Sequence, residues 1–302
     1  MLGIYSEVFS VVFALVSVLL ACCWVKSQLT YTKTTTLDSP IKGNLGDPIV
    51  LYGWAKLPTL PGDRAIRSSP YVGKVETWLR FAQLPYTYEG TLQPANGPKG
   101  QVPYIKHGKN VVADSAFIIK YLQATYGNPP PNSALQPLDL HQQALSTACS
   151  TIAMERLAWF LTYHRFVPLS GWSNFRVMLS SLPLLLKPIL YPYMRATFVK
   201  RLYTQGFARH SERDVSRLLH DDLAALSAIL GDNPYLLGEA PCEADAAMFS
   251  VLEQIIYGQA ISPEAKQILQ QYPSLCKHTK RVRDTFFPDF PVEGVSKSDK
   301  SA

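Results

Sequence analysis

The sequence predicts an α/β domain followed by an all-α domain, with one transmembrane helix ahead of both. Three observations lead to this fold class. An uncharged apolar run covers residues 8–25, strand and helix patterns alternate over residues 47–127, and only helical patterns follow over residues 137–288. Of the 302 residues, 47% are hydrophobic and 17% are charged, which is typical of folded proteins and not of disordered ones.

The apolar run is long enough, at about 1.5 Å per residue, to cross most of the hydrocarbon core of a bilayer. Only the amino terminus and Glu7 are charged before it, whereas three lysines follow it between residues 26 and 42. The positive-inside rule then places the rest of the chain in the cytosol. We expect an uncleaved anchor over residues 1–26. A cleaved signal peptide is the alternative, but it would need a basic segment before a shorter apolar core.

Two polar segments flank the folded part. Residues 27–46 form a threonine-rich linker, and residues 289–302 form a small polar tail that we expect to be disordered. The net charge of +6 fits an anionic membrane surface or nucleic acid equally well. No pair among the five cysteines has metal-ligand or C-x-x-C spacing, which favours a reducing compartment. Cys22 and Cys23 lie at the cytosolic edge of the anchor, where palmitoylation would add a second membrane signal.

The α/β domain begins with an apolar strand over residues 48–54. A helix follows from Pro70, with Ser69 as its N-cap, because serine caps helices well and proline suits the first helical position. Three short strands and a helix complete the domain, at residues 86–88, 102–106, 109–113 and 114–126. We expect Phe117 of the last helix to face the core. The order of strand, helix, three strands and helix is a thioredoxin-like layout.

Pro103 opens one of these buried strands. Proline is unusual there, because it cannot donate a hydrogen bond to the neighbouring strand. In thioredoxin-like folds this proline is cis and faces the active site. We therefore expect the Val102–Pro103 peptide bond to be cis.

The all-α domain contains several segments with apolar residues at helical spacing. We expect helices at residues 138–163, 211–230 and 242–257, and two shorter ones separated at Pro273. Cys242 and Asp245 have the spacing of a capping box, with cysteine in the position that serine or threonine usually takes.

A thioredoxin-like half joined to an all-helical half resembles the glutathione-transferase fold. The stretches GQVPYI and ADSAFIIKYL are similar to the cis-proline and the acidic-serine pair of that family. The stretches SPYVGKVETWLRF, QGFARHSERD and DDLAALSAILGDNPYLLGEAPCEADAAMF together resemble one branch of it, the failed-axon-connections and metaxin-related proteins. This resemblance spans about residues 48 to 288. It is compatible with an anchor, because membrane association recurs in that branch.

The resemblance implies a glutathione site. Ser69 would donate a hydrogen bond to the glutathione thiolate, and Asp114 and Ser115 would hold the γ-glutamyl end. Val102 and Pro103 would bind the cysteinyl backbone. Ser69, Asp114 and Ser115 also have a simpler interpretation, since all three are ordinary residues at helix starts.

The sequence departs from the enzyme pattern in two places. The stretch SPYV aligns with a redox C-P-Y-C motif, and Ser69 and Val72 replace both cysteines, which excludes disulfide exchange at this position. Only ten residues separate Gly90 from Gln101. The second helix of the fold, which helps to form the glutathione site, is therefore shortened or lost.

The segment from Arg156 to Ser211 contains eight lysine or arginine residues and no acidic residue. Aromatic residues are interleaved with the basic ones, and the run LPLLLKPILYPY at the centre is too broken by proline to span a membrane. Such a segment suits an anionic lipid surface or a partner. Alternatively, its aromatic residues belong to the core and its basic residues are solvated. Because no nucleic-acid-binding module accompanies it, we expect no nucleic-acid partner.

Two functions remain open. The first is a non-catalytic or weakly catalytic adaptor at the cytosolic face of a membrane, either the mitochondrial outer membrane or the endoplasmic reticulum. The second is a glutathione transferase in which Ser69 activates the thiol. The missing cysteines, the short second-helix segment and the anchor favour the adaptor. No histidine has ligand spacing, so we expect no metal site. The resemblance allows a homodimer, while protein partners stay unspecified.

Overall fold

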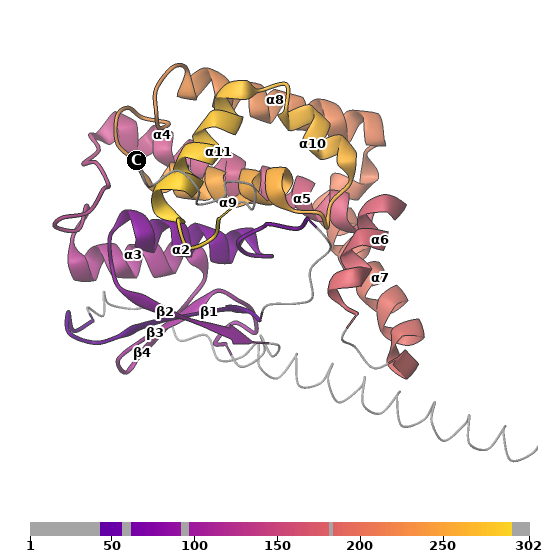
Figure 1. Ribbon diagram of the computed structural model, residues 1–302, viewed down its shortest axis with the longest axis horizontal. Helices are drawn as coiled ribbons and strands as arrows, with labels where there is room; N and C mark the ends of the chain where they lie inside the picture. The colour runs from indigo at the N-terminus through magenta and orange to yellow at the C-terminus, as the bar shows by residue number, and fades with distance from the viewer. Residues whose placement is uncertain (1–42, 56–61, 92–96, 181–183, 292–302) are drawn as a thin grey trace, which may run out of the picture.

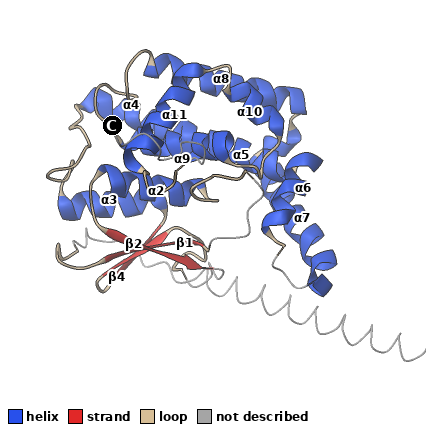
Figure 2. Cartoon of the chain, viewed as in Figure 1, coloured by secondary structure: helices blue, strands red, loops and turns tan. Residues whose placement is uncertain are grey.

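The computed structural model describes residues 43–55, 62–91, 97–180 and 184–291. The anchor predicted for residues 1–26 lies outside these ranges. Within them, no helix combines the length and the apolar character that crossing a membrane requires. Figure 2 shows three layers in this part of the chain, which are a sheet, two helices packed on it, and a larger group of helices beyond them.

A four-stranded sheet in the order β2–β1–β3–β4 forms the first layer. The strands are β1 (Ile49–Trp54), β2 (Tyr86–Thr91), β3 (Tyr104–His107) and β4 (Asn110–Ala113). β1 pairs parallel with β2 and antiparallel with β3, and β3 pairs antiparallel with β4. β4 therefore runs parallel to β1, and β3 starts at the edge of the sheet where β1 and β4 end.

Two helices, α2 (Pro70–Phe81) and α3 (Ser115–Tyr126), pack on one face of this sheet (Figure 1). The predicted order of elements is confirmed. The expectation for Phe117 is wrong, because its side chain is 46% exposed. Ile118, Ile119 and Leu122 occupy the inward side of α3 and are fully buried, which turns Phe117 toward solvent.

The connection from β2 to β3 includes the segment in which we expect the second helix to be shortened or lost. Residues 97–103 form turns and bends without a helix, and residues 92–96 lie outside the described ranges. The Val102–Pro103 bond is cis, as expected, and a second cis bond joins Asn128 to Pro129.

The second half of the chain is helical, as predicted. Its elements are α4 (Leu140–Thr151), a π-helical turn η2 (Ile152–Leu157), α5 (Ala158–Phe166), α6 (Leu169–Met178), a 3₁₀ turn η3 (Leu184–Leu186), α7 (Lys187–Gln205), a 3₁₀ turn η4 (Phe207–Arg209), α8 (Glu212–Leu230), α9 (Glu243–Tyr257), α10 (Pro263–Leu269) and α11 (Pro273–Phe286). The predicted capping box of α9 is present, since the backbone N–H of Cys242 donates to Asp245 Oδ2 at 2.8 Å.

Helix α9 joins the two halves. It lies along α2 (Figure 1), and almost every one of its residues is buried. Ala246 and Phe249 of α9 belong to the hydrophobic core that also contains the sheet, whereas Met248 and Leu252 belong to the core of the helical half. Burial of one helix in both cores fixes the first half against the second.

Candidate functional site

The sheet topology brings the predicted glutathione residues to one edge of the first domain. At this edge the first residue of β3, Tyr104, pairs with Tyr52 of β1 and with Ala113 of β4. The residues expected to hold glutathione come directly before β3, directly after β4, and at the start of α2, which follows β1: Val102, Pro103, Asp114, Ser115 and Ser69. All five therefore lie toward the same end of the strands.

Ser69 is the N-cap of α2, as the sequence predicts. Its Oγ accepts a long hydrogen bond of 3.5 Å from the backbone N–H of Val72, and its side chain is half-buried. Among the described residues, the hydroxyl proton of Ser69 has no acceptor. The hydroxyl can therefore cap the helix and still donate one hydrogen bond to a ligand.

Asp114 and Pro103 are joined through their backbones. The N–H of Asp114 donates to the carbonyl oxygen of Pro103 at 3.2 Å. Asp114 has a φ of 82°, which non-glycine residues rarely adopt, and its Oδ1 accepts from the N–H of Ala116 at 3.0 Å. The carboxylate is exposed, so it caps α3 and faces solvent at the same time. Strained backbone of this kind concentrates at ligand sites.

Ser115 is the first residue of α3 and is only 7% exposed. Within the described part of the chain, its Oγ has no hydrogen-bond partner. The N-terminus of α3 offers unpaired backbone N–H groups next to this hydroxyl, which suits a carboxylate ligand. Val102 packs against the core of the first domain.

Tyr71 connects this edge to the helical half. Its hydroxyl donates to the carbonyl oxygen of Met154 at 3.2 Å, and Met154 lies in the π-helical turn between α4 and α5. Burial, together with the charges of Glu155 and Asp114, raises the pKa of Tyr71 to about 12. Tyr71 therefore stays protonated at neutral pH, and its hydroxyl proton is already donated to Met154.

No described cysteine supplies a reactive thiolate. Cys149 and Cys242 are buried, and Cys276 is partly buried. Burial raises the pKa of Cys149 to about 11 and also raises the pKa values of Cys242 and Cys276. Val72, which takes the place of the second cysteine of the redox motif, is buried and apolar. Any thiol chemistry at this edge would need a thiol from the ligand.

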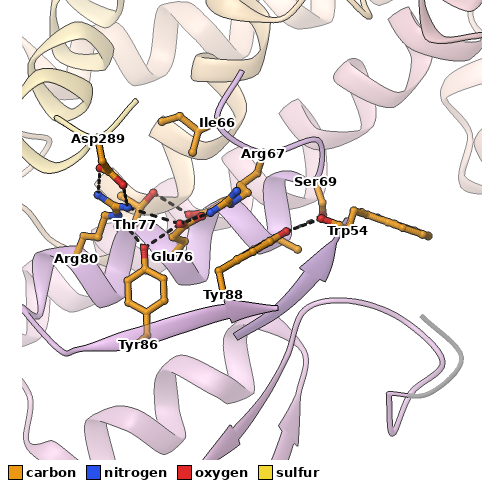
Figure 3. Close-up of polar contacts among 12 residues, drawn as sticks. Trp54, Ile66, Arg67, Ser69, Glu76, Thr77, Arg80, Tyr86, Tyr88 and Asp289 are labelled. Carbon is orange, nitrogen blue, oxygen red and sulfur yellow. Dashed lines mark hydrogen bonds and ion pairs between the residues drawn. The ribbon is translucent and has the colours of Figure 1, made fainter. Parts of the chain in front are cut away.

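A polar cluster on α2 was not predicted from the sequence (Figure 3). Glu76 is fully buried and receives two hydrogen bonds from Arg67, at 2.6 and 2.8 Å, and one from Tyr86 at 2.8 Å. Arg80 donates to the Tyr86 hydroxyl at 2.8 Å and forms two hydrogen bonds with Asp289. The only signal in the sequence is a glutamate on the inward side of an apolar helix, which does not reveal its distant partners.

The basic aromatic segment forms a projecting pair of helices, α6 and α7 (Figure 1). We call residues 169–205 the α6–α7 hairpin. Its aromatic residues pack against one another and against α5, with Phe166 stacked on Phe198 at 4.0 Å and near Phe175 at 4.8 Å. This agrees with the expectation that aromatic residues serve as core. The segment that leads into α7 is different, because Leu184 and Leu185 are 77% and 88% exposed.

Comparison with protein-family models gives two matches. The first is the glutathione S-transferase N-terminal domain, over residues 70–170, and the second is the glutathione S-transferase C-terminal domain, over residues 219–282. Among solved structures, a beta-etherase from Sphingobium sp. aligns with a TM-score of 0.52 over 80% of this chain and 98% of that chain. At 18% sequence identity, this likeness shows the fold alone.

Curated relatives narrow the family. The Failed axon connections protein of Drosophila melanogaster is 31% identical over 259 residues, which cover 81% of this chain and 59% of that protein. This chain thus spans about three fifths of the length of that relative. The isoprene-epoxide–glutathione S-transferase of a Rhodococcus species is 28% identical over 257 residues, which cover 79% of this chain and 99% of that protein.

The metaxins match at lower identity. Metaxin-2 of Mus musculus is 26% identical over 196 residues, which cover 64% of this chain and 72% of that protein. A relative from Arabidopsis thaliana, named mitochondrial outer membrane import complex protein METAXIN, is 23% identical and covers 69% of this chain and 65% of its own length. The matched domain models and these relatives agree with the motifs of the sequence: the chain belongs to the glutathione-S-transferase-like proteins of the failed-axon-connections and metaxin-related branch.

Proposed function

We propose that this protein is a non-catalytic or weakly catalytic adaptor that contacts the cytosolic face of a membrane through the α6–α7 hairpin. The observation that carries this proposal is the apolar tip of the hairpin. Leu184, Leu185, Leu186, Ile189 and Tyr193 are 77%, 88%, 39%, 40% and 55% exposed. Exposed aliphatic residues grouped in one short segment are typical of surfaces that bind membranes or partners.

The charge of the hairpin favours an anionic lipid surface as the partner in this proposal. Its basic residues Arg176, Lys187, Lys200 and Arg201 form no ion pair with any acidic residue that the structure describes. Each basic residue close to an anionic membrane contributes about 1 kcal/mol of binding free energy. Apolar side chains at the tip and unpaired cations along α7 together favour insertion at the headgroup level.

The membrane anchor belongs to the same proposal. The uncharged run at residues 8–25, with lysines after it, would tether the folded part on the cytosolic side. The name of the Arabidopsis metaxin supports the mitochondrial outer membrane over the endoplasmic reticulum. A tether would hold the hairpin close to the bilayer and raise its local concentration there.

Quenching by brominated lipids tests the contact in the full chain. Leu185→Trp and Leu140→Trp replace leucines of similar exposure, 88% and 84%. Figure 1 shows α4, which begins at Leu140, at the opposite end of the molecule from the tip of α7. Brominated anionic vesicles should quench the added fluorescence at position 185 and not at position 140. Equal quenching at the two positions would reject the hairpin as the contact surface.

A glutathione transferase is the second candidate function. Two features favour it, the free hydroxyl of Ser115 at the start of α3 and the backbone hydrogen bond between Asp114 and Pro103. The relative named isoprene-epoxide–glutathione S-transferase adds support. In this mechanism Ser69 would donate its hydrogen bond to the thiolate of bound glutathione and hold it ionised.

Calorimetric titration with glutathione tests this second function. Wild type, Ser69→Ala and Ser115→Ala are compared with Ser173→Ala, which changes an exposed serine on α6. Binding in the low-millimolar range that only Ser115→Ala weakens would support a glutathione site, and a loss of thiol ionisation in Ser69→Ala would support catalysis. Absence of heat at saturating glutathione would reject the transferase.

A further inference from the structure

A cavity of about 510 Å³ lies between the segment that precedes α2 and the helical half. It is lined by residues 62–68 of the first half, by α5, α9 and α11 of the second half, and by residues 289–291. None of the five predicted glutathione residues lines it. Its volume is within the range of pockets that bind small molecules, roughly 300–1,000 Å³. Its charged lining residues are Asp63, Arg64, Arg67, Arg165, Arg283 and Asp289.

Three of these charges are already paired. Arg67 pairs with Glu76, as Figure 3 shows, and Asp289 pairs with Arg80. Arg283 pairs with the buried Glu253 at 2.6 Å. Each pair has no net charge, so the net charge of the cavity depends on the other three residues, Asp63, Arg64 and Arg165.

Arg165 has no carboxylate partner. It donates to two neutral acceptors, the carbonyl oxygen of Ser68 at 2.8 Å and Oε1 of Gln254 at 2.6 Å. A guanidinium has five N–H donors, so three remain, and the buried Nε has no partner among the described residues. Arg64 is exposed and has no ion-pair partner in the same ranges. With Asp63 as the one acid left, the cavity carries an excess positive charge.

The wall of the cavity also contains N–H groups that have no hydrogen-bond acceptor in the described ranges. The Nε of Arg283, a residue that is only 2% exposed, also lacks a partner within the described structure. Burial lowers the pKa of Arg165 to about 10, although the charges of Asp63 and Glu253 oppose that shift. The charged form of Arg165 is therefore poorly solvated, and a bound anion would stabilise it.

We propose that this cavity binds a small organic anion, a carboxylate or a phosphate ester, through the free N–H donors of Arg165 with Arg64 at the rim. Trp54 and Phe290 line the same cavity and would contact the apolar part of such a ligand. The site is separate from the predicted glutathione residues, so it does not depend on either function proposed above.

Binding of inorganic phosphate and of citrate to the full chain tests the proposal. Isothermal titration at constant ionic strength should show saturable binding in the millimolar range or tighter. Arg165→Gln should weaken it about tenfold or more, because a charge-assisted hydrogen bond is lost. Arg64→Gln should weaken it less, since this side chain lies at the exposed rim. Tighter binding of citrate than of phosphate would identify a carboxylate ligand, and the reverse would identify a phosphate ester.

Two controls keep the result decisive. Arg217→Gln makes the same charge change on the exposed face of α8 and should leave the affinity unchanged. If Arg165→Gln does not fold, Arg64→Gln can still test whether the cavity binds the anion. This variant should fold, because no described residue forms an ion pair with the Arg64 side chain. The proposal is overturned if wild type binds neither anion saturably, or if both cavity variants bind like Arg217→Gln. Ser115→Ala should not change this binding, which separates the cavity from a glutathione site.

Discussion

The backbone N–H of Asp114 donates a hydrogen bond of 3.2 Å to the carbonyl oxygen of Pro103. This bond ties the residue before β3 to the N-cap of α3, although the two are eleven positions apart in the chain. It holds Asp114 at a φ of 82°, where only glycine is free of steric strain. Two of the predicted glutathione residues, Pro103 and Asp114, are thus linked through their backbones.

Asp114→Ala should be clearly less stable than Asp114→Gly. Loss of the N-cap of α3 costs about 1 kcal/mol of the free energy of unfolding for alanine but only a few tenths for glycine. Alanine also keeps the strained φ, so the difference between the two variants should reach about 1 to 2 kcal/mol. Urea unfolding followed by circular dichroism measures the difference. Equal stability of the two variants would mean that the backbone relaxes without glycine.

Glu76 should be essential for stability, because it is the acceptor of the polar cluster on α2. Removal of one member of a buried ion pair leaves the other charge uncompensated and costs about 3–5 kcal/mol. We expect Glu76→Ala to lose that much and Glu76→Gln to lose less, since the amide still accepts hydrogen bonds from Arg67 and Tyr86. Thermal unfolding against Glu212→Ala, an exposed glutamate on α8, measures the effect. A loss below 1 kcal/mol for Glu76→Ala would contradict it.

His164 should make the protein less stable as the pH falls. Its imidazole is fully buried, its Nδ1 lies 2.6 Å from the Ser262 hydroxyl, and burial lowers its pKa to about 4 from an ordinary 6.5. Between pH 4 and pH 6.5, His164 binds a proton in the unfolded chain but stays neutral in the folded chain. The stability present above pH 6.5 is therefore lost toward pH 4, by at most about 1.4 kcal/mol per pH unit.

The comparison with His164→Gln isolates this effect. The variant should lose less stability than wild type between pH 6.5 and pH 4, because glutamine can keep a hydrogen bond to Ser262 without titrating. Urea unfolding at several pH values gives the two slopes. Parallel slopes would show that His164 is not the titrating group.

Charge reversal on α7 should weaken the membrane contact. Lys200→Glu with Arg201→Glu removes two exposed cations from the hairpin and should cost at least about 2 kcal/mol at an anionic surface, a loss of roughly 30-fold. The Leu185→Trp reporter measures the quenching in each background. Arg213→Glu with Arg217→Glu makes the same charge change on α8 and should leave quenching as it was. The same loss in both pairs would point to overall charge and not to the hairpin.

The amino-acid sequence predicts most of this fold, because local patterns specify it. Ser69 and Pro70 define the start of α2, and apolar spacing defines its buried side. The cis bond at Pro103 follows from the thioredoxin-like layout, in which the proline that opens this strand is cis. The expectation for Phe117 is wrong, because helical spacing alone does not decide whether the buried side of α3 includes Phe117 or begins at Ile118.

The polar interior could not be read from the sequence. Arg67 and Glu76 are nine positions apart, but Arg165 meets Ser68 and Gln254 across about ninety positions. Such contacts depend on how α2, α5 and α9 pack together, and no local spacing encodes that. The exposure of Leu185 could not be predicted from the sequence either, because an apolar residue in an apolar run is ordinarily expected to be buried.

Hydrogen–deuterium exchange on the full chain in vesicles tests the central claim most directly. The first amides of α7 lack intrahelical partners, so residues 184–190 should exchange readily in neutral vesicles. In vesicles that contain phosphatidylserine, we predict slower exchange across this segment and unchanged exchange across α8. The same exchange of residues 184–190 in neutral and anionic vesicles would contradict a membrane contact by the hairpin.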